Sequence, residues 1–133
     1  MRSRRRSSKR TRRRRGGGFS VVYSGIPVRG QEFTREQTAS PPQVQIPAGH
    51  YIVMADSDAV KPDWIHWIAT SEKEILRYQG PSPPPGTGIH KYRLYLVAGN
   101  PPRPPKTRGG QSAPALAPNP VAVAEFTVAA EKN

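Results

Sequence analysis

The chain has 133 residues, with 21 lysines and arginines against nine aspartates and glutamates, and it has no cysteine. This length allows one domain with a modest core, and the lack of cysteine excludes disulfides, thiolate metal sites and a thiol nucleophile. No apolar run approaches the roughly 20 residues that a membrane-spanning helix needs, and the basic N-terminus lacks the apolar segment of a secretory signal.

The positive charge is concentrated in residues 2–15, RSRRRSSKRTRRRR, which hold ten basic residues and no acidic one. Such a segment repels itself and cannot bury apolar surface, so residues 1–18 are predicted to form a disordered arm that ends in a flexible glycine joint. The arm can bind a polyanion without reading a base sequence. Its basic residues are Arg2, Arg4, Arg5, Arg6, Lys9, Arg10, Arg12, Arg13, Arg14 and Arg15.

Residues 19–133 carry eleven basic and nine acidic residues and show the pattern of a folded domain. Short runs rich in β-branched and aromatic residues, separated by proline and glycine, predict strands. The core strands are expected at residues 20–24, 51–56, 64–70 and 91–97, with an edge strand near 44–46 and a last strand within 121–130. Residues 71–78 are compatible with one helical turn or with a polar connection, and residues 99–120 predict a proline-rich extended loop.

Many short strands with little helix predict an all-β to β-rich domain, built as a sandwich. The continuous apolar run from Tyr51 to Ala55 suits a strand that is buried on both faces.

Three segments place polar residues at strand ends and on a stiff loop: Asp56-Ser57-Asp58-Ala59, Trp64-Ile65-His66-Trp67, and the run from Gly80 to Tyr92. In this order they resemble the hallmarks of the phosphatidylethanolamine-binding protein family, also called the Raf kinase inhibitor family. Those hallmarks are Asp-Pro-Asp-x-Pro, a His-Trp-like pair, and Gly-Pro-x-Pro-Pro-x-Gly-x-His-x-Tyr. The resemblance covers about residues 19–130 and implies the β-sandwich of that family.

Two departures from the family pattern bear on the site. Both prolines of the aspartate segment are replaced, so the wall that carries Asp56 and Asp58 is expected to be looser. Family members usually continue with a strand and a C-terminal helix that covers the ligand site, so the domain is expected to be trimmed and to need a neighbour over the bare apolar face.

By resemblance, the ligand-binding residues are Asp56, Asp58, His66, Pro83, Pro84, His90 and Tyr92. A carboxylate can fix the tautomer of an imidazole, and the second ring nitrogen, loop N–H groups and the Tyr92 hydroxyl could then donate to a phosphate or carboxylate. The alternative is purely structural: the two aspartates cap a turn, and His66 is a core histidine between two tryptophans.

No nucleophile elbow, Walker loop or His-Glu-x-x-His motif is present, so no enzyme and no cofactor are expected. The aspartates and histidines of the site could in principle hold a metal, but the family is not one of metalloenzymes, and no metal site is predicted.

Two function classes remain. The favoured one is a structural component, joined by its arm to a polyanion or to neighbouring subunits of a virus particle or ribonucleoprotein. The alternative is a regulator that binds a small phosphate-bearing ligand, a phospholipid headgroup or a kinase. The expected location is intracellular or within a virus particle, and the basic arm is also compatible with the nucleus.

Overall fold

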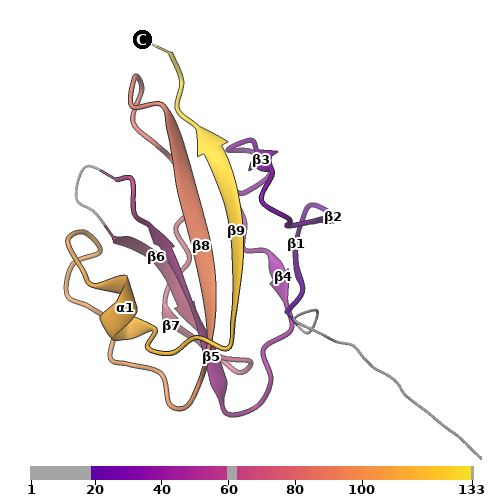
Figure 1. Cartoon of the computed structure of the whole chain (residues 1–133), viewed down its shortest axis with the longest axis vertical. Coiled ribbons are helices and arrows are strands. Elements are labelled where there is room, and N and C mark those ends of the chain that lie inside the picture. Colours follow the sequence, from indigo (N-terminus) through magenta and orange to yellow (C-terminus); the bar gives the residue numbers. More distant parts are fainter. Residues whose placement is uncertain (1–18, 60–62, 133) are drawn as a thin grey trace, which may run out of the picture.

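The computed structural model describes residues 19–59 and 63–132, which form two β-sheets and one short helix (Figure 1). The smaller sheet has the strand order β2-β1-β4, and the larger has the order β3-β9-β8-β5-β6-β7. The elements are β1 (Val21–Tyr23), β2 (Ile26–Pro27), β3 (Glu32–Phe33), β4 (Gln43–Val44), β5 (His50–Asp56), β6 (Trp64–Ala69), β7 (Glu74–Leu76), β8 (Ile89–Ala98), α1 (Ala113–Leu116) and β9 (Ala122–Ala129).

These elements confirm the β-rich fold class and every strand that the sequence predicts. The core strands appear as β1, β5, β6 and β8, the edge strand as β4, and the last strand as β9. The arm, by contrast, lies outside the described residues. Within residues 19–59 and 63–132, no helix is long and apolar enough to cross a membrane.

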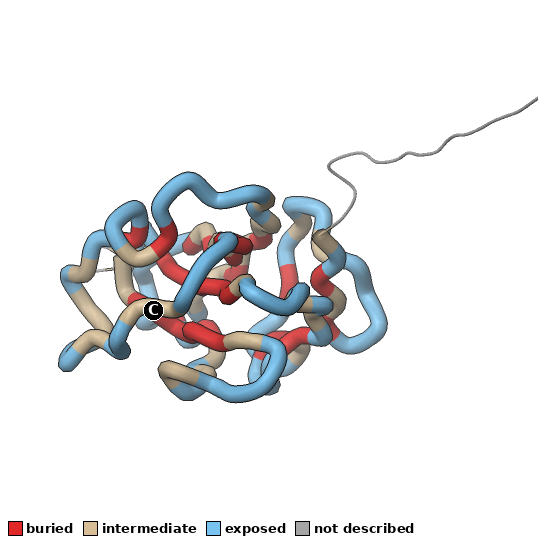
Figure 2. Tube along the Cα trace, turned by 90° about the horizontal axis from the view of Figure 1, so that it is seen from below, coloured by how far each residue is buried: buried red, intermediate tan, exposed pale blue. Residues whose placement is uncertain are grey.

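The larger sheet has a hydrophobic core on each face, which explains the continuous apolar run of β5. One core lies between the two sheets and includes Tyr23, Ile52 and Phe126. The other packs the opposite face, including Val53 and Ile68, against α1 and its flanking residues. β8 shows the alternation of a strand in such a sheet, because its even-numbered residues from His90 to Leu96 are buried. Figure 2 shows the buried residues gathered along the strands inside a shell of exposed loops.

Two segments differ from the prediction. Residues 71–78 contain β7, an edge strand that pairs with β6, instead of a helical turn or a simple connection. The Trp67 indole N–H donates to Glu74 across this pair at 2.9 Å, which ties β7 to the sheet. Pairing with the neighbouring strand therefore decides the structure of a segment whose local pattern is weak.

Residues 99–120 are irregular for most of their length but contain α1. The Ser112 hydroxyl accepts from the Ala115 amide at 3.2 Å, and Pro114 occupies the first turn, where a missing N–H costs nothing. The Asp63 carboxylate accepts from the Ala113 amide at 3.1 Å and joins the helix to the start of β6. Caps from inside and outside the segment thus stabilise a helix of one turn.

Candidate ligand-binding site

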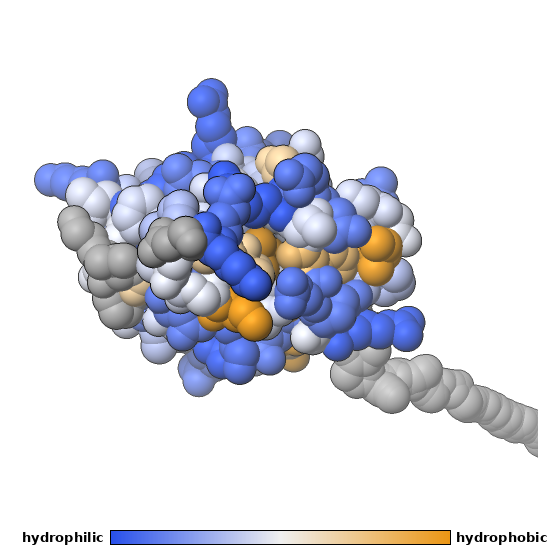
Figure 3. All heavy atoms as spheres, turned by 90° about the horizontal axis from the view of Figure 1, so that it is seen from above, coloured by the Kyte–Doolittle hydropathy of each residue, from blue (hydrophilic) through white to orange (hydrophobic). Residues whose placement is uncertain are grey.

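A cavity of about 390 Å³ opens where β5 ends and where β6 and β8 begin. Figure 3 looks onto this end of the molecule, where apolar atoms lie between polar side chains. The cavity is lined by Asp56, Ala59, Trp64, His66, Gln79, Gly80, Ser82, Pro83, Pro84, His90 and Tyr92. The structure therefore brings together all the predicted site residues except Asp58.

Strand register explains why distant residues meet here. Asp56 lies opposite Trp64 on one side and opposite Tyr92 on the other. A β-bulge between Met54 and Ala55 leaves His66 without a direct partner on β5. Bulges re-aim side chains near functional sites; here the bulge lets His66 face the cavity while Trp67 packs in the core between the sheets.

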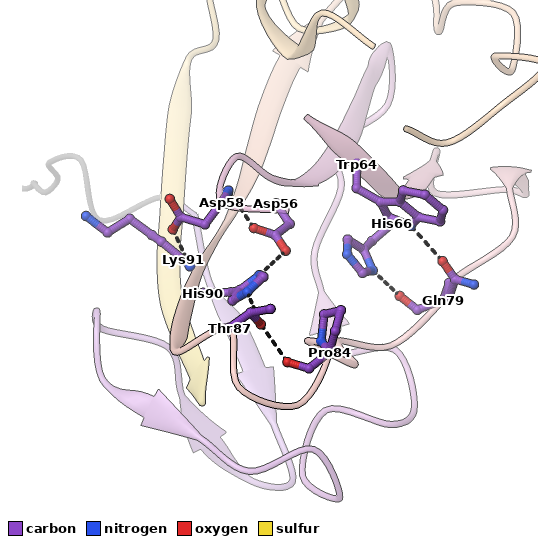
Figure 4. A network of polar contacts seen from close by, with 9 residues as sticks. All are labelled: Asp56, Asp58, Trp64, His66, Gln79, Pro84, Thr87, His90 and Lys91. Atoms are coloured by element: carbon purple, nitrogen blue, oxygen red, sulfur yellow. Dashed lines mark hydrogen bonds and ion pairs between the residues drawn. The ribbon is translucent and has the colours of Figure 1, made fainter. Parts of the chain in front are cut away.

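Polar groups form a hydrogen-bonded chain across one wall of the site, from the exposed Pro84 and Thr87 to the buried His90 and Asp56 (Figure 4). The Thr87 hydroxyl donates to the Pro84 carbonyl at 2.6 Å, so its oxygen accepts from His90 Nε2, which lies 2.9 Å away. His90 Nδ1 lies 2.8 Å from Asp56 Oδ2, and both side chains are almost fully buried. Both nitrogens of His90 are therefore occupied. The sequence analysis expected the second nitrogen of an aspartate-bound imidazole to donate to a ligand, but in His90 this nitrogen donates to Thr87.

The same chain fixes the charge of this wall. His90 Nε2 carries a hydrogen, and a second hydrogen must lie between Nδ1 and Asp56, on one partner or the other. In either arrangement the Asp56–His90 pair is neutral as a whole. Its carboxylate therefore opposes an anionic ligand much less than a free aspartate would.

Hydrogen bonds hold the aspartate segment in place of the prolines that it lacks. Asp56 Oδ1 accepts from the Asp58 amide at 2.8 Å, an Asx turn, and Asp58 Oδ2 accepts from the Lys91 amide at 2.9 Å. The looser wall expected from the missing prolines stays a prediction. The predicted placement of Asp58 is corrected, because Asp58 is bonded to the backbone of β8 and does not line the cavity.

The ring of His66 is fixed by one hydrogen bond, made through Nδ1. Its Nδ1 lies 2.6 Å from the Gln79 carbonyl oxygen, which can only accept, so Nδ1 must carry the hydrogen. Burial lowers the pKa of His66, and the positive charge of Arg108 and the nearby His90 add to this, against the Gln79 carbonyl and Asp56, which raise it. At neutral pH the ring is therefore neutral, and Nε2 is an acceptor.

Gln79 is a site residue that the sequence analysis missed. Its carbonyl orients His66, its amide donates back to the His66 carbonyl at 2.9 Å, and its side-chain oxygen accepts from the Trp64 indole at 2.8 Å. Its position directly before the Gly-Pro motif is the one signal that could have pointed to it.

Tyr92 forms the floor between the two histidines. Its ring meets His66 edge-on at 5.3 Å and stacks on Phe126 at 5.3 Å. Burial, and then the negative charge of Asp56, raise the pKa of Tyr92. A side-chain hydrogen bond to Asp56 raises it further, so the hydroxyl stays protonated and its hydrogen is directed toward Asp56.

The rim is stiff and offers few amides. Prolines occupy positions 81, 83, 84 and 85, so Gly80 and Ser82 are the rim residues that keep an N–H. A Cβ on Gly80 would lie 2.9 Å from the Thr38 carbonyl oxygen, so glycine is needed for this close approach. Arg35 donates to the Ser82 hydroxyl at 3.1 Å and pairs with Glu131 at 3.6 Å, next to the rim.

In the part of the chain that the structure describes, no three histidine, aspartate or glutamate side chains are grouped as metal ligands would be. The Asp56–His90 pair is the nearest approach to such a group, and its atoms are engaged with each other, with Thr87 and with the Asp58 amide.

Comparison with solved structures identifies the fold. A phosphatidylethanolamine-binding protein from Plasmodium vivax superposes with a TM-score of 0.65 at 22% identity, over 85% of each chain. A carboxypeptidase Y inhibitor, solved with its cognate proteinase, superposes with a TM-score of 0.66 at 19% identity, over 86% of this chain and 83% of that one. The fold is that of the phosphatidylethanolamine-binding proteins. No family model and no curated protein sequence matches the chain.

Proposed function

We propose that this phosphatidylethanolamine-binding-protein-like domain is a non-catalytic binding module whose cavity takes the phosphate or carboxyl end of a small ligand. The observation that carries the proposal is the pairing of a cavity of about 390 Å³, within the usual size of small-ligand sites, with a buried His66 that has one engaged and one available nitrogen. The name of the Plasmodium vivax neighbour agrees with a phosphate-bearing ligand.

The charge of the walls supports this proposal. The Asp56–His90 pair is neutral, the Tyr92 hydroxyl is protonated, and Arg35 lies against the rim through Ser82. Apart from Gln79 and Ser82, the remaining lining, which includes Trp64 and Pro84, has no polar side chain and suits the uncharged body of a ligand.

Catalysis is disfavoured by the direction of one hydrogen bond. Thr87, His90 and Asp56 follow one another in the order of a nucleophile, a base and an orienting carboxylate, at 2.9 and 2.8 Å. The Thr87 hydrogen, however, goes to the Pro84 carbonyl, so His90 Nε2 already holds a hydrogen and cannot accept another. Thr87 also does not line the cavity.

The test is a titration of the full chain with inorganic phosphate, followed by NMR of the histidine rings. Phosphate is expected to perturb His66, and Tyr92→Phe should weaken binding by about tenfold, the effect of one lost hydrogen bond to a charged group. His50→Gln is the matched control, because His50 lies at the opposite end of β5 and its ring bonds to the Ala48 carbonyl, away from the cavity. If phosphate leaves His66 unchanged, or if the two variants bind alike, the proposal is wrong.

The arm supports a second candidate function, the structural role that the sequence favours. Residues 2–15 hold ten basic residues and no acidic one, whereas the rest of the chain is nearly neutral. We propose that the arm anchors the protein to a polyanion, or to acidic surfaces of neighbouring subunits in a virus particle or ribonucleoprotein.

Deleting residues 2–15 tests this second candidate. Removing exposed charges should leave the melting temperature nearly unchanged, while binding to a random-sequence RNA should be lost. Binding by the intact chain should fall steeply between low and moderate salt. Retained RNA binding by the shortened chain, or binding that does not respond to salt, would show that the arm is not the anchor.

A further inference from the structure

A proline-rich stretch, residues 100–107, takes no part in the cavity; we call it the proline segment. Its sequence is NPPRPPKT, and it follows β8 in the loop that leads to α1 (Figure 1). Pro101 and Pro104 are three positions apart, and Lys106 follows two positions later. This is the spacing Pro-x-x-Pro with a basic residue after it, which is typical of segments that bind aromatic-lined grooves.

Both ends of the proline segment are fixed to the larger sheet. The Gly99 amide donates to the Gly49 carbonyl at 2.7 Å, next to the start of β5, and the Ile65 amide donates to the Arg108 carbonyl at 2.8 Å. Ile65 lies opposite Ala55, so the two attachments are about 20 Å apart along β5, at about 3.3 Å per residue. The steps from residue 99 to residue 108 would cover only about 14 Å as an α-helix but about 28 Å as polyproline II. The segment is therefore held extended.

The prolines favour the polyproline II conformation between these attachments. Each proline fixes φ at about −65°, and a residue that precedes a proline is biased away from the helical region. Residues 100–105 form neither helix, strand nor turn, and residues 100–106 make no hydrogen bond with another described residue. Their carbonyl groups therefore stay open to hydrogen-bond donors of a partner.

Polyproline II has three residues per turn, so residues three positions apart share a face. Pro102 and Pro105, on one face, are both half-buried, whereas Arg103 and Lys106, on another, are both exposed, as is Pro104. Among residues 19–59 and 63–132, neither of these two basic side chains has an ion-pair partner. The outer side of the segment thus presents proline rings next to two cations.

We propose that residues 100–106 are a docking site for an SH3 domain whose aromatic-lined groove takes Pro101 and Pro104 and whose acidic rim pairs with Arg103 and Lys106. The chemistry of the partner follows from the segment, because proline rings and open carbonyls suit aromatic side chains, and two cations need carboxylates. Docking orders little additional chain, since the sheet already holds the segment extended. The surface is separate from the cavity and joins the domain to a second protein.

The first test measures the binding of the full chain to a broad panel of purified SH3 domains at physiological ionic strength, where distant charges are screened. The domain that binds best is then titrated with variants. Exchange of both Pro101 and Pro104 for alanine should weaken binding by about tenfold or more, because two apolar contacts in the groove are lost. Pro118→Ala is the control, since Pro118 is an exposed proline after α1.

A second test reverses the charge of the segment. Arg103→Glu combined with Lys106→Glu should weaken binding by about 10- to 100-fold, because the new carboxylates face those of the groove. Arg29→Glu combined with Lys73→Glu is the matched control, since both residues are exposed and lie outside the segment. Deletion of residues 2–15 should leave the binding in place, which separates the segment from the basic arm.

A synthetic peptide of residues 99–108 tests whether the folded domain presents the segment. The full chain should bind the SH3 domain at least as tightly as the peptide, because the sheet has already fixed the conformation. Binding by the peptide but not by the full chain would show that the segment is covered, and would overturn the proposal. The same conclusion follows if no SH3 domain binds, if the segment variants bind like their controls, or if deletion of the arm abolishes binding. Tighter binding by a WW domain than by every SH3 domain would contradict the class of partner.

Discussion

The two cavity histidines have the same chemistry in the sequence and opposite roles in the structure. His90 is fixed between Asp56 and Thr87 and stabilises the wall, whereas His66 is fixed by one carbonyl and its Nε2 has no partner in the described part of the chain. A histidine takes its role from the partner of its other nitrogen. Those partners, Gln79 and Thr87, come from loops, so the motifs predicted which residues meet but not which one contacts a ligand.

A second, partly buried chain of hydrogen bonds lies between the rim and the core. The Tyr23 and Tyr78 hydroxyls lie 2.6 Å apart, and Tyr78 donates to the Thr38 carbonyl at 2.6 Å. Burial raises the pKa of Tyr78 to about 12. Its hydroxyl therefore stays protonated, and remains a donor, over the pH range in which His66 titrates. Gly80 packs against the same Thr38 carbonyl. The tyrosine hydrogen bonds therefore help to fix the position of the rim relative to the core.

At the scale of elements, the loop before α1 is more than a connection. The Arg108 guanidinium donates to the carbonyls of Ile65 and His66 at 3.1 Å each and to that of Arg77 at 2.8 Å. The Arg108 carbonyl accepts from the Ile65 amide at 2.8 Å. The arginine therefore fastens the proline-rich segment to β6 where the β-bulge presents His66.

Arg108→Lys should weaken the attachment of the proline-rich segment to β6. A lysine ammonium cannot satisfy three carbonyls in the geometry of the guanidinium fork, so the free energy of unfolding should drop by about 1–3 kcal/mol. Phosphate affinity should drop with it, because His66 loses its backbone support. Arg103→Lys is the control, since Arg103 is an exposed residue of the same loop.

Urea denaturation of both variants measures the stability effect. Equal midpoints for Arg108→Lys and Arg103→Lys would show that the guanidinium contacts contribute nothing to the fold.

The elements themselves were predictable where local pattern and burial agree. The apolar run of β5 and the alternation in β8 required no long-range information. β7, α1 and the bulge in β6 were not predictable, because each depends on a partner in another element. That partner is Trp67 on β6 for β7, Asp63 for α1, and β5, with its uneven register, for the bulge.

For the whole molecule, three motifs in the right order predicted the fold that the solved structures bear out, although no family model matches. Antiparallel pairing of β5 with β6 and with β8 brings the end of β5 and the starts of β6 and β8 to one end of the sheet. Residues 34 positions apart, such as Asp56 and His90, therefore form one wall. The sequence did not reveal that hydrogen bonds would replace the missing prolines of the aspartate segment, because the acceptor of the Lys91 amide is set by tertiary structure.

The most direct measurement is a long-range proton–nitrogen NMR spectrum of the histidine rings in the full chain, recorded from pH 7 downward. His66 should be neutral at pH 7, with its hydrogen on Nδ1 and Nε2 at the shift of an acceptor. Because burial lowers its pKa, the charged form should appear only below the usual histidine range. Adding phosphate at pH 7 should move the Nε2 signal in the direction of hydrogen-bond formation. A hydrogen on Nε2 at pH 7, or titration of His66 at or above the usual range, would contradict the acceptor role of His66 and the binding function proposed from it.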